Sequence, residues 1–151
     1  MKHSNGFTLV ELLVVISIIT LLASVVLTSL NSARAKARDA QRKENLHQME
    51  TALRIYFLDN NDFPHCGLYD GGGWTARSTE LYWSACMTPI MSKYIPVMPI
   101  DPINDRPDGG LSLYYYYVCY AIDAFSPCTS AYLNAYFETL TPNFAAITIN
   151  P

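Results

Sequence analysis

Apolar residues form one long stretch near the start of the chain. From Phe7 to Leu30 almost every residue is apolar, and the interruptions are small hydroxyl side chains and one carboxylate, Glu11. The nineteen residues from Leu12 to Leu30 span about 28 Å as a helix, which is close to the hydrocarbon thickness of a bilayer. The pattern therefore predicts a transmembrane helix.

The same stretch could instead be the hydrophobic region of a cleavable signal peptide. Residues 33–35 and 35–37 both have the A-x-A pattern that suits such cleavage. However, the hydrophobic region of a signal peptide usually runs only about 7–15 residues, and this one is longer and carries an acidic residue near its start. The chain also continues beyond it without a helix breaker, so we favour retention of the segment over its removal.

Residues 32–58 contain neither glycine nor proline and are rich in good helix formers. One helical face carries apolar residues at steps of three and four: Leu46, Met49, Leu53 and Tyr56. The charged residues of this stretch, including Arg42 and Arg54, are expected on the other faces. The apolar helix therefore continues as an amphipathic one, and it should end in the turn-forming residues 59–64, where Pro64 disfavours helix at the residue before it.

The remainder of the chain predicts a small sheet behind an irregular middle. Residues 65–110 contain a glycine triplet at 71–73, which is interpreted as a flexible loop, a short helix at 78–93 that is broken near Pro89, and successive Pro/Asp/Asn turns. The clearest strand is 111–122, followed by strands at 132–140 and 144–149. Aromatic residues at strand spacing favour sheet packing as the role of Tyr114–Tyr117 over carbohydrate binding or electron conduction. The fold class is α+β, with a long N-terminal helix packed on a C-terminal antiparallel sheet.

Charge is distributed unevenly between the two ends of the chain. Residues 1–43 carry a net charge of +4 and residues 44–151 a net charge of −7. An acidic body does not suit a nucleic-acid-binding domain, which would present a basic face. The basic cluster Arg34–Lys43 is best interpreted as a solvated or subunit-bridging helix face. Contacts of this cluster with lipid headgroups or DNA are the alternatives, and binding to DNA has no further support.

The four cysteines all follow the apolar stretch: Cys66, Cys86, Cys119 and Cys128. None belongs to a CxxC pair of the kind a zinc site favours. An even number of cysteines beyond a membrane-targeting segment predicts two disulfides in an oxidising compartment. Three pairings are possible, and we favour the sequential one.

The sequence contains no candidate metal, cofactor or catalytic site. Asp101, Asp105 and Asp108 lack the spacing of a calcium loop and are interpreted as turn residues. His47 and His65 have no partners in the sequence that would suggest a catalytic constellation. We therefore expect no metal, no cofactor and no enzymatic activity.

A carboxylate inside an apolar membrane segment costs a few kcal/mol and usually marks a function. Here Glu11 closes the sequence Gly6-Phe7-Thr8-Leu9-Val10-Glu11, which runs on into Leu12-Leu13-Val14-Val15-Ile16. This segment resembles the processing motif of type IV pilins and of the pseudopilins of type II secretion. The motif is highly specific, and the resemblance covers residues 1–64 well.

The resemblance implies a set of roles for the N-terminal residues. A prepilin peptidase would cut between Gly6 and Phe7, and Phe7 would become a methylated N-terminus. Glu11 would be the acidic assembly residue, able to pair with the charged N-terminus of a neighbouring subunit. The expected organisation is a leader at 1–6, a transmembrane and filament-core helix at 7–30, its amphipathic continuation at 31–60, and a globular pilin-like domain at 61–151.

Later parts of the chain match the family more loosely. Residues 52–60 with Phe63-Pro64 resemble the helix end of the major pseudopilins, and 94–102 with the tyrosine run resemble the loop that enters their sheet. After Tyr117 the acidic calcium-binding loop of the secretion major pseudopilin cannot be found. The four cysteines are a further departure from that group, so the resemblance does not separate a pilus from a secretion pseudopilus.

The expected function is that of a structural filament subunit. Its partners would be copies of itself, minor pilins, the prepilin peptidase, the inner-membrane assembly platform and, before assembly, membrane lipid. It would cross the inner membrane once and then enter an extracellular or periplasmic filament. One alternative is a pseudopilin that acts in protein export. A second is a membrane-anchored or secreted binding domain that forms no filament.

Overall fold

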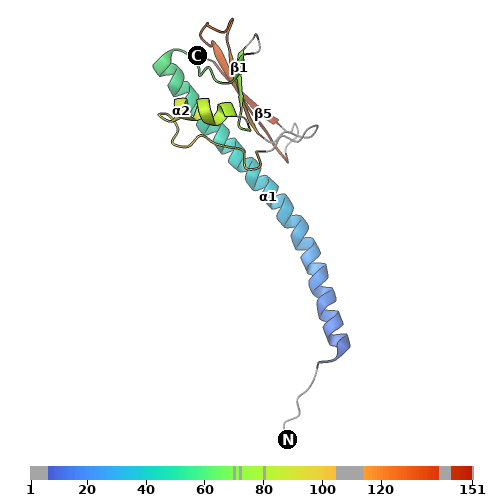
Figure 1. The fold of residues 1–151 in the computed structure, drawn as a ribbon. Helices are drawn as coiled ribbons and strands as arrows, with labels where there is room; N and C mark the ends of the chain where they lie inside the picture. Colours follow the sequence, from blue (N-terminus) through green and yellow to red (C-terminus); the bar gives the residue numbers. More distant parts are fainter. Residues whose placement is uncertain are drawn as a thin grey trace. The chain divides into compact units, whose positions relative to one another are not determined.

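The structure is a computed structural model that describes residues 7–69, 71, 73–79, 81–104, 114–139 and 144–150. The chain divides into two compact units, Met1–Ala37 and Arg38–Pro151. Helix α1 (Leu9–Asn60) has 52 residues and contributes to both units (Figure 1). It confirms the long helix that the sequence predicts. The predicted division of the chain into four stretches stays a prediction.

Helix α1 ends where the sequence turns from helix formers to Asn and Asp. The backbone N–H of Asn61 still donates to the carbonyl of Phe57 at 2.7 Å, but Asn61 itself has a φ of 54°. Asn tolerates this left-handed conformation better than most residues, which makes it a suitable position for a helix to stop. The predicted end of the helix within residues 59–64 is therefore confirmed.

The sheet of the second unit has five antiparallel strands in the order β1-β2-β3-β4-β5. Their bounds are Leu68–Tyr69 for β1, Gly73–Arg77 for β2, Tyr115–Tyr120 for β3, Ser130–Tyr136 for β4 and Phe144–Ile149 for β5. The predicted central position of β3 and the bounds of β5 are confirmed. Strand β4 begins two residues earlier and ends four residues sooner than expected. Strand β3 is shorter than the predicted 111–122, because residues 114, 121 and 122 are not part of it, while residues 111–113 lie outside the described residues.

The sequence pattern does not predict strands β1 and β2. They are short and lie next to the glycine triplet, whose Gly73 opens β2 while Gly72 lies outside the described residues. A Cβ at Gly73 would collide with the carbonyl oxygen of Cys119 on the paired strand β3. The glycine therefore permits close strand pairing here, so the interpretation of this stretch as a flexible loop is wrong for Gly73.

The core lies between the inner face of the sheet and the part of α1 that belongs to the second unit. Its helix residues are Leu46, Met49, Ala52 and Leu53. Tyr115 and Tyr117 of β3 face them and are fully buried, which confirms sheet packing as their role. Both hydroxyls are satisfied, since Asn45 donates to that of Tyr115 at 2.8 Å and Tyr117 donates to the carbonyl of Pro64 at 2.9 Å. Burial raises the pKa of Tyr115 to about 12.

The helical part of the middle region differs from the prediction. A π-helical turn, η1 (Trp83–Met87), runs directly into α2 (Thr88–Met91). The prediction that Pro89 breaks the helix is wrong, because Pro89 lies inside α2, two residues after the π-helical turn ends, and the helix continues to Met91. The indole of Trp83 is buried and donates to the carbonyl of Pro99 at 3.0 Å, which holds the following loop against the core.

Candidate functional site

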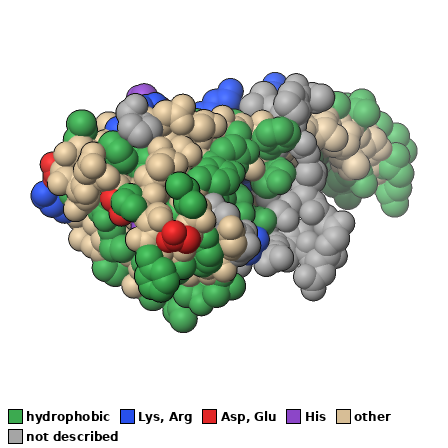
Figure 2. Space-filling model, turned by 90° about the horizontal axis from the view of Figure 1, so that it is seen from above, with side chains coloured by type: hydrophobic (Ala, Val, Ile, Leu, Met, Phe, Trp, Pro, Cys, Tyr) green, Lys and Arg blue, Asp and Glu red, His purple; other side chains and the backbone are tan. Residues whose placement is uncertain are grey.

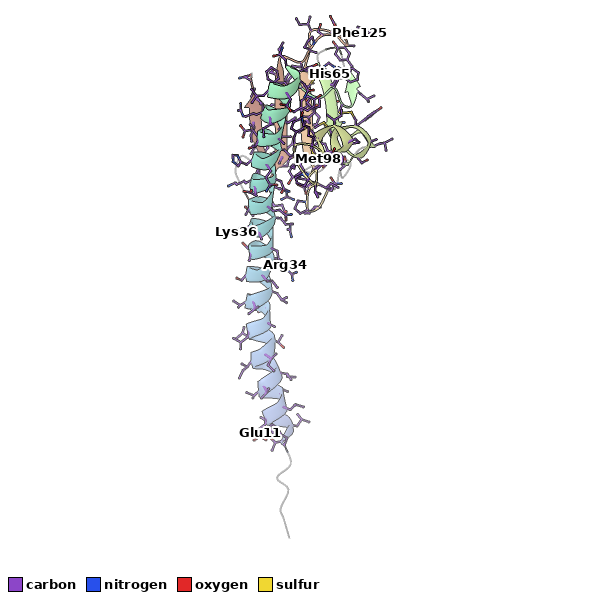
Figure 3. All side chains as sticks on the ribbon, turned by 90° about the vertical axis from the view of Figure 1, so that its left-hand side faces the viewer. Glu11, Arg34, Lys36, His65, Met98 and Phe125 are labelled. Atoms are coloured by element: carbon purple, nitrogen blue, oxygen red, sulfur yellow. A yellow bond between two sulfur atoms is a disulfide. The ribbon has the colours of Figure 1, made fainter. Side chains whose placement is uncertain are left out.

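Thr8 and Glu11 close the first turn of α1. Figure 3 labels Glu11 at this end of the helix. The carboxylate Oε2 of Glu11 accepts from the backbone N–H of Thr8 at 2.8 Å and from its hydroxyl at 2.7 Å. The Thr8 hydroxyl in turn accepts from the backbone N–H of Glu11 at 3.3 Å. This reciprocal arrangement is a capping box, which satisfies backbone donors that a helix start leaves unpaired. Phe7 is 81% exposed, and Gly6 lies outside the described residues.

The apolar stretch of α1 is exposed in the part of the chain that the structure describes. The described residues contain one helix that is long and apolar enough to cross a membrane, and none of its apolar window is buried. Four hydroxyls within it donate to carbonyls of the same helix, as when Ser17 donates to the carbonyl of Leu13 at 2.8 Å and Thr20 to that of Ile16 at 2.7 Å. Each such bond pairs a hydroxyl donor that would otherwise face lipid or a neighbouring helix.

The second unit contains a buried ionic cluster around Arg42, whose side chain is fully buried. Its guanidinium donates to both carboxylate oxygens of Asp101 at 2.7 and 3.0 Å, to Asp39 at 2.8 Å and to Glu138 at 2.8 Å. These carboxylates come from three separate places: the loop after α2, the helix itself and the segment after β4. The cluster therefore ties three parts of the unit to one helical position.

The carboxylates of the cluster receive further hydrogen bonds. Asp39 accepts from the backbone N–H groups of Glu138 and Thr139 and from the Thr139 hydroxyl. Burial opposes the charge of Asp39, but these bonds outweigh it and hold its pKa below the usual value. The bidentate contact with Arg38 similarly lowers the pKa of Glu138. Two guanidiniums and three carboxylates are thus buried or half-buried together with their partners in place.

The cluster corrects two sequence-based interpretations. Arg42 does not lie on a solvated helix face, although Arg34, Lys36 and Lys43 of the same basic cluster are exposed. Asp101 is more than a turn residue, because its carboxylate is buried against Arg42, while Asp105 and Asp108 lie outside the described residues. The Asp39–Arg42 spacing of three residues was the one local signal, and it could not reveal partners that lie far away in the sequence.

Both disulfides lie in the second unit. The structure joins Cys66 to Cys86 and Cys119 to Cys128, with Cα–Cα distances of 5.7 and 5.6 Å. This is the sequential pairing that the sequence favoured. The first disulfide connects the segment after α1 to η1, and the second closes the hairpin between β3 and β4. No cysteine of the chain is free.

A group of potential metal ligands, His65 with Cys119 and Cys128, also lies in this region, with the ligand atoms within 4.8 Å of one another. Metal binding by cysteine requires the thiolate, and both sulfurs are joined to each other. His65 instead lies within hydrogen-bonding distance of Asp62, at 3.2 Å, and its ring stacks on that of Trp74. We assign no metal to this group.

Comparison with known proteins places these features in a family. Residues 1–27 match the family described as the prokaryotic N-terminal methylation motif. The chain is 40% identical over 63 residues to the type IV wide pilus major component PilA4 of Thermus thermophilus, covering 42% of this chain and 48% of that protein. No solved structure was found to match.

Two further relatives are type II secretion system core proteins G. The chain is 40% identical over 63 residues to that of Aeromonas hydrophila, covering 42% of this chain and 44% of that protein. It is 41% identical over 102 residues to that of Klebsiella pneumoniae, covering 56% of this chain and 73% of that protein. The chain thus spans just under half the length of PilA4 and of the Aeromonas protein. It belongs to the family of type IV pilins and type II secretion pseudopilins.

Proposed function

We propose that this chain is a structural subunit of a type IV pilus or pseudopilus filament. One observation carries the proposal: a prepilin-type cleavage and methylation motif leads directly into an apolar helix that its own chain leaves uncovered. The family is one of structural subunits, and the relatives named above are a pilus component and secretion core proteins. The chain therefore acts by assembly, with no catalytic step of its own.

Before assembly the apolar stretch of α1 anchors the subunit in the inner membrane, where it meets the prepilin peptidase. Cleavage after Gly6 leaves Phe7 as the new N-terminus, which is then methylated. Removal from the membrane exposes the apolar stretch to other copies of itself, so the same residues that matched lipid then form the filament core. The remaining partners in this proposal are minor pilins and the inner-membrane assembly platform.

Glu11 has two possible contributions, capping its own helix and pairing with the charged N-terminus of a neighbouring subunit. Glu11→Gln separates them, because glutamine still serves in a capping box but carries no charge. If the ion pair drives assembly, Glu11→Gln subunits should be processed normally and yield few filaments. Filaments at the wild-type yield from Glu11→Gln or Glu11→Leu subunits would show that pairing is not required.

The proposed function is tested by mass spectrometry of the mature subunit together with electron microscopy of the cells that produce it. An N-terminus at methylated Phe7 in isolated filaments supports the proposal. An intact Met1, or cleavage after Ala35 or Ala37, would instead support a membrane-anchored or secreted binding domain. The two outcomes differ by several hundred daltons or more and cannot be confused.

A pseudopilin that acts in protein export is the second candidate, and the identity to core protein G over 102 aligned residues favours it. The two filament types differ in where the subunit accumulates. Surface filaments are removed from cells by shearing, whereas a periplasmic pseudopilus remains with the cell. Recovery of the subunit in the sheared fraction supports the pilus, and its retention together with an export defect on deletion supports the pseudopilus.

A further inference from the structure

The hairpin loop between β3 and β4, residues 121–129, exposes two large apolar side chains to solvent. Phe125 is 97% exposed and Ile122 is 85% exposed. Phe125 lies at the outer tip of the second unit, beyond the last turn of α1 (Figure 3). Hydrophobic side chains are also visible among polar ones over the surface of this unit (Figure 2), but few are as fully exposed as Phe125.

This loop is held in one conformation by several constraints. The Cys119–Cys128 disulfide closes its base, where the Thr129 N–H also donates to the carbonyl of Tyr120 at 2.9 Å. At its tip the carboxylate Oδ1 of Asp123 accepts from the N–H groups of Phe125 and Ser126 at 2.9 and 2.8 Å. A loop ordered in advance loses little conformational entropy when it binds, which favours recognition by its apolar side chains.

An apolar hollow of about 180 Å³ lies elsewhere on the same unit, beside the end of α1. We call it the Phe57 hollow, and it is lined by Arg54, Phe57, Leu58, Phe63, Ile149 and Asn150. Phe63 and Ile149 are buried, whereas Leu58 is 82% exposed. An apolar cavity of about 150 Å³ is large enough for benzene, so one phenyl ring fits. Since Phe125 is almost wholly exposed, the loop of the same chain does not fill the hollow.

The charged residues beside Phe125 and beside the Phe57 hollow are complementary, in addition to the fit in size. Asp123 lies two residues from Phe125 on the loop, and the hydrogen bonds it accepts from Phe125 and Ser126 keep its pKa below the usual value. Arg54 lines the hollow and is half exposed while it bonds Glu50 in the same helix. A phenyl ring in the hollow would thus be accompanied by an acidic group near a basic one.

We infer that the tip of the 121–129 loop docks into the Phe57 hollow of a second copy of this chain. The contact joins two different surfaces of one protein, so it is heterologous and can repeat from subunit to subunit without closing a ring. Phe125 supplies the apolar contact, and Asp123 faces Arg54 of the neighbouring copy. This inference rests on the proposed filament, in which copies of the second unit are held at high local concentration.

Charge reversal in the producing cells tests the contact with the full chain. Asp123→Arg and Arg54→Asp should each lower the yield of filaments relative to total subunit by roughly tenfold, as expected when a contact of about 1.4 kcal/mol turns unfavourable. The double variant Asp123→Arg with Arg54→Asp should recover most of that yield. Failure of the double variant to recover, or wild-type yields from both single variants, would overturn the contact.

Apolar truncation provides an independent measurement. Phe125→Ala should reduce filament yield by about tenfold, whereas the matched control Leu81→Ala should not, since Leu81 is 75% exposed but belongs to neither surface. An equal effect of both substitutions would overturn the inference. The N-terminus of each variant is read in parallel by mass spectrometry. If every variant has a methylated Phe7 and forms normal filaments, only the docking contact is rejected. If the wild-type protein forms no filaments and lacks this N-terminus, the proposed function is rejected as well.

Discussion

Residues 9–30 expose their apolar side chains, whereas the unit Arg38–Pro151 buries three charged ones, Asp39, Arg42 and Asp101, in its interior. Each arrangement costs free energy in water unless partners are supplied. The second unit supplies its own partners, because the three buried groups pair through Arg42 and are joined by Glu138 and Thr139. The apolar stretch pairs most of its hydroxyls with its own backbone, but its apolar side chains stay exposed. The difference indicates that one region folds by itself and the other is completed by a membrane or by neighbouring subunits.

The largest expected effect comes from removing the charge at the centre of the second unit. Arg42→Met leaves buried Asp101 without its ion-pair partner, removes one partner from Asp39 and one from Glu138, and should lower the free energy of unfolding by about 3–5 kcal/mol. Urea unfolding of the full chain in detergent, followed by the fluorescence of Trp74 and buried Trp83, measures it. The matched control Arg54→Met removes only an exposed i,i+4 pair and should cost less than about 0.5 kcal/mol. Equal costs would contradict the role given to the cluster.

The reverse experiment places a charge in the apolar stretch of α1, where a charged side chain would have no partner. Ile19→Asp should weaken membrane insertion by about 3 kcal/mol and leave the urea midpoint of the second unit unchanged, because Ile19 is exposed and belongs to the other unit. Sedimentation of membranes measures insertion, with Ile19→Leu as the control. A shifted unfolding midpoint would show that the two regions are not independent.

The disulfides test how much of the second unit's stability comes from chain constraint. Replacing Cys66 and Cys86 by alanine opens a link with a sequence separation of 20 and should cost about 3 kcal/mol. The link between Cys119 and Cys128 has a separation of 9, and its loss should cost somewhat less. The same urea measurement ranks the stability costs of losing the two disulfides. A larger cost for the Cys119–Cys128 link would show that buried packing of the sulfurs outweighs loop length.

Lowering the pH is expected to have a smaller effect on the stability of the second unit. The pKa values of Asp39 and Glu138 are lowered from ordinary values of 3.8 and 4.5, so both groups stabilise the folded state above these values. This contribution should be lost as the pH falls below about 4.5 and the folded-state carboxylates take up protons. Asp39→Asn should flatten the decline of stability in this range, and urea midpoints between pH 2 and 7 measure it. An unchanged slope would mean that Asp39 does not titrate with unfolding.

Local patterns in the sequence predicted those helices and strands whose characteristic residues are consecutive in the chain. The helix, the central strand and the strand Phe144–Ile149 follow from runs of helix formers or of β-branched and aromatic residues. Strands β1 and β2 carry too few residues for such a signal, and the role of Pro89 depends on where the preceding π-helical turn stops. The roles of Gly6, Phe7 and Glu11 were taken from a resemblance and stay predictions.

The sequence by itself determined that residues 1–27 carry an N-terminal methylation motif and that an apolar helix forms there, because both depend on consecutive residues. Only the tertiary structure decided that Arg42 is buried. Its partners Asp101 and Glu138 lie 59 and 96 residues away, and they meet it only when the loop after α2 and the end of β4 pack against the helix. Hydrophobic periodicity reports which face of a helix is apolar, and a buried ion pair on that face carries no such signal.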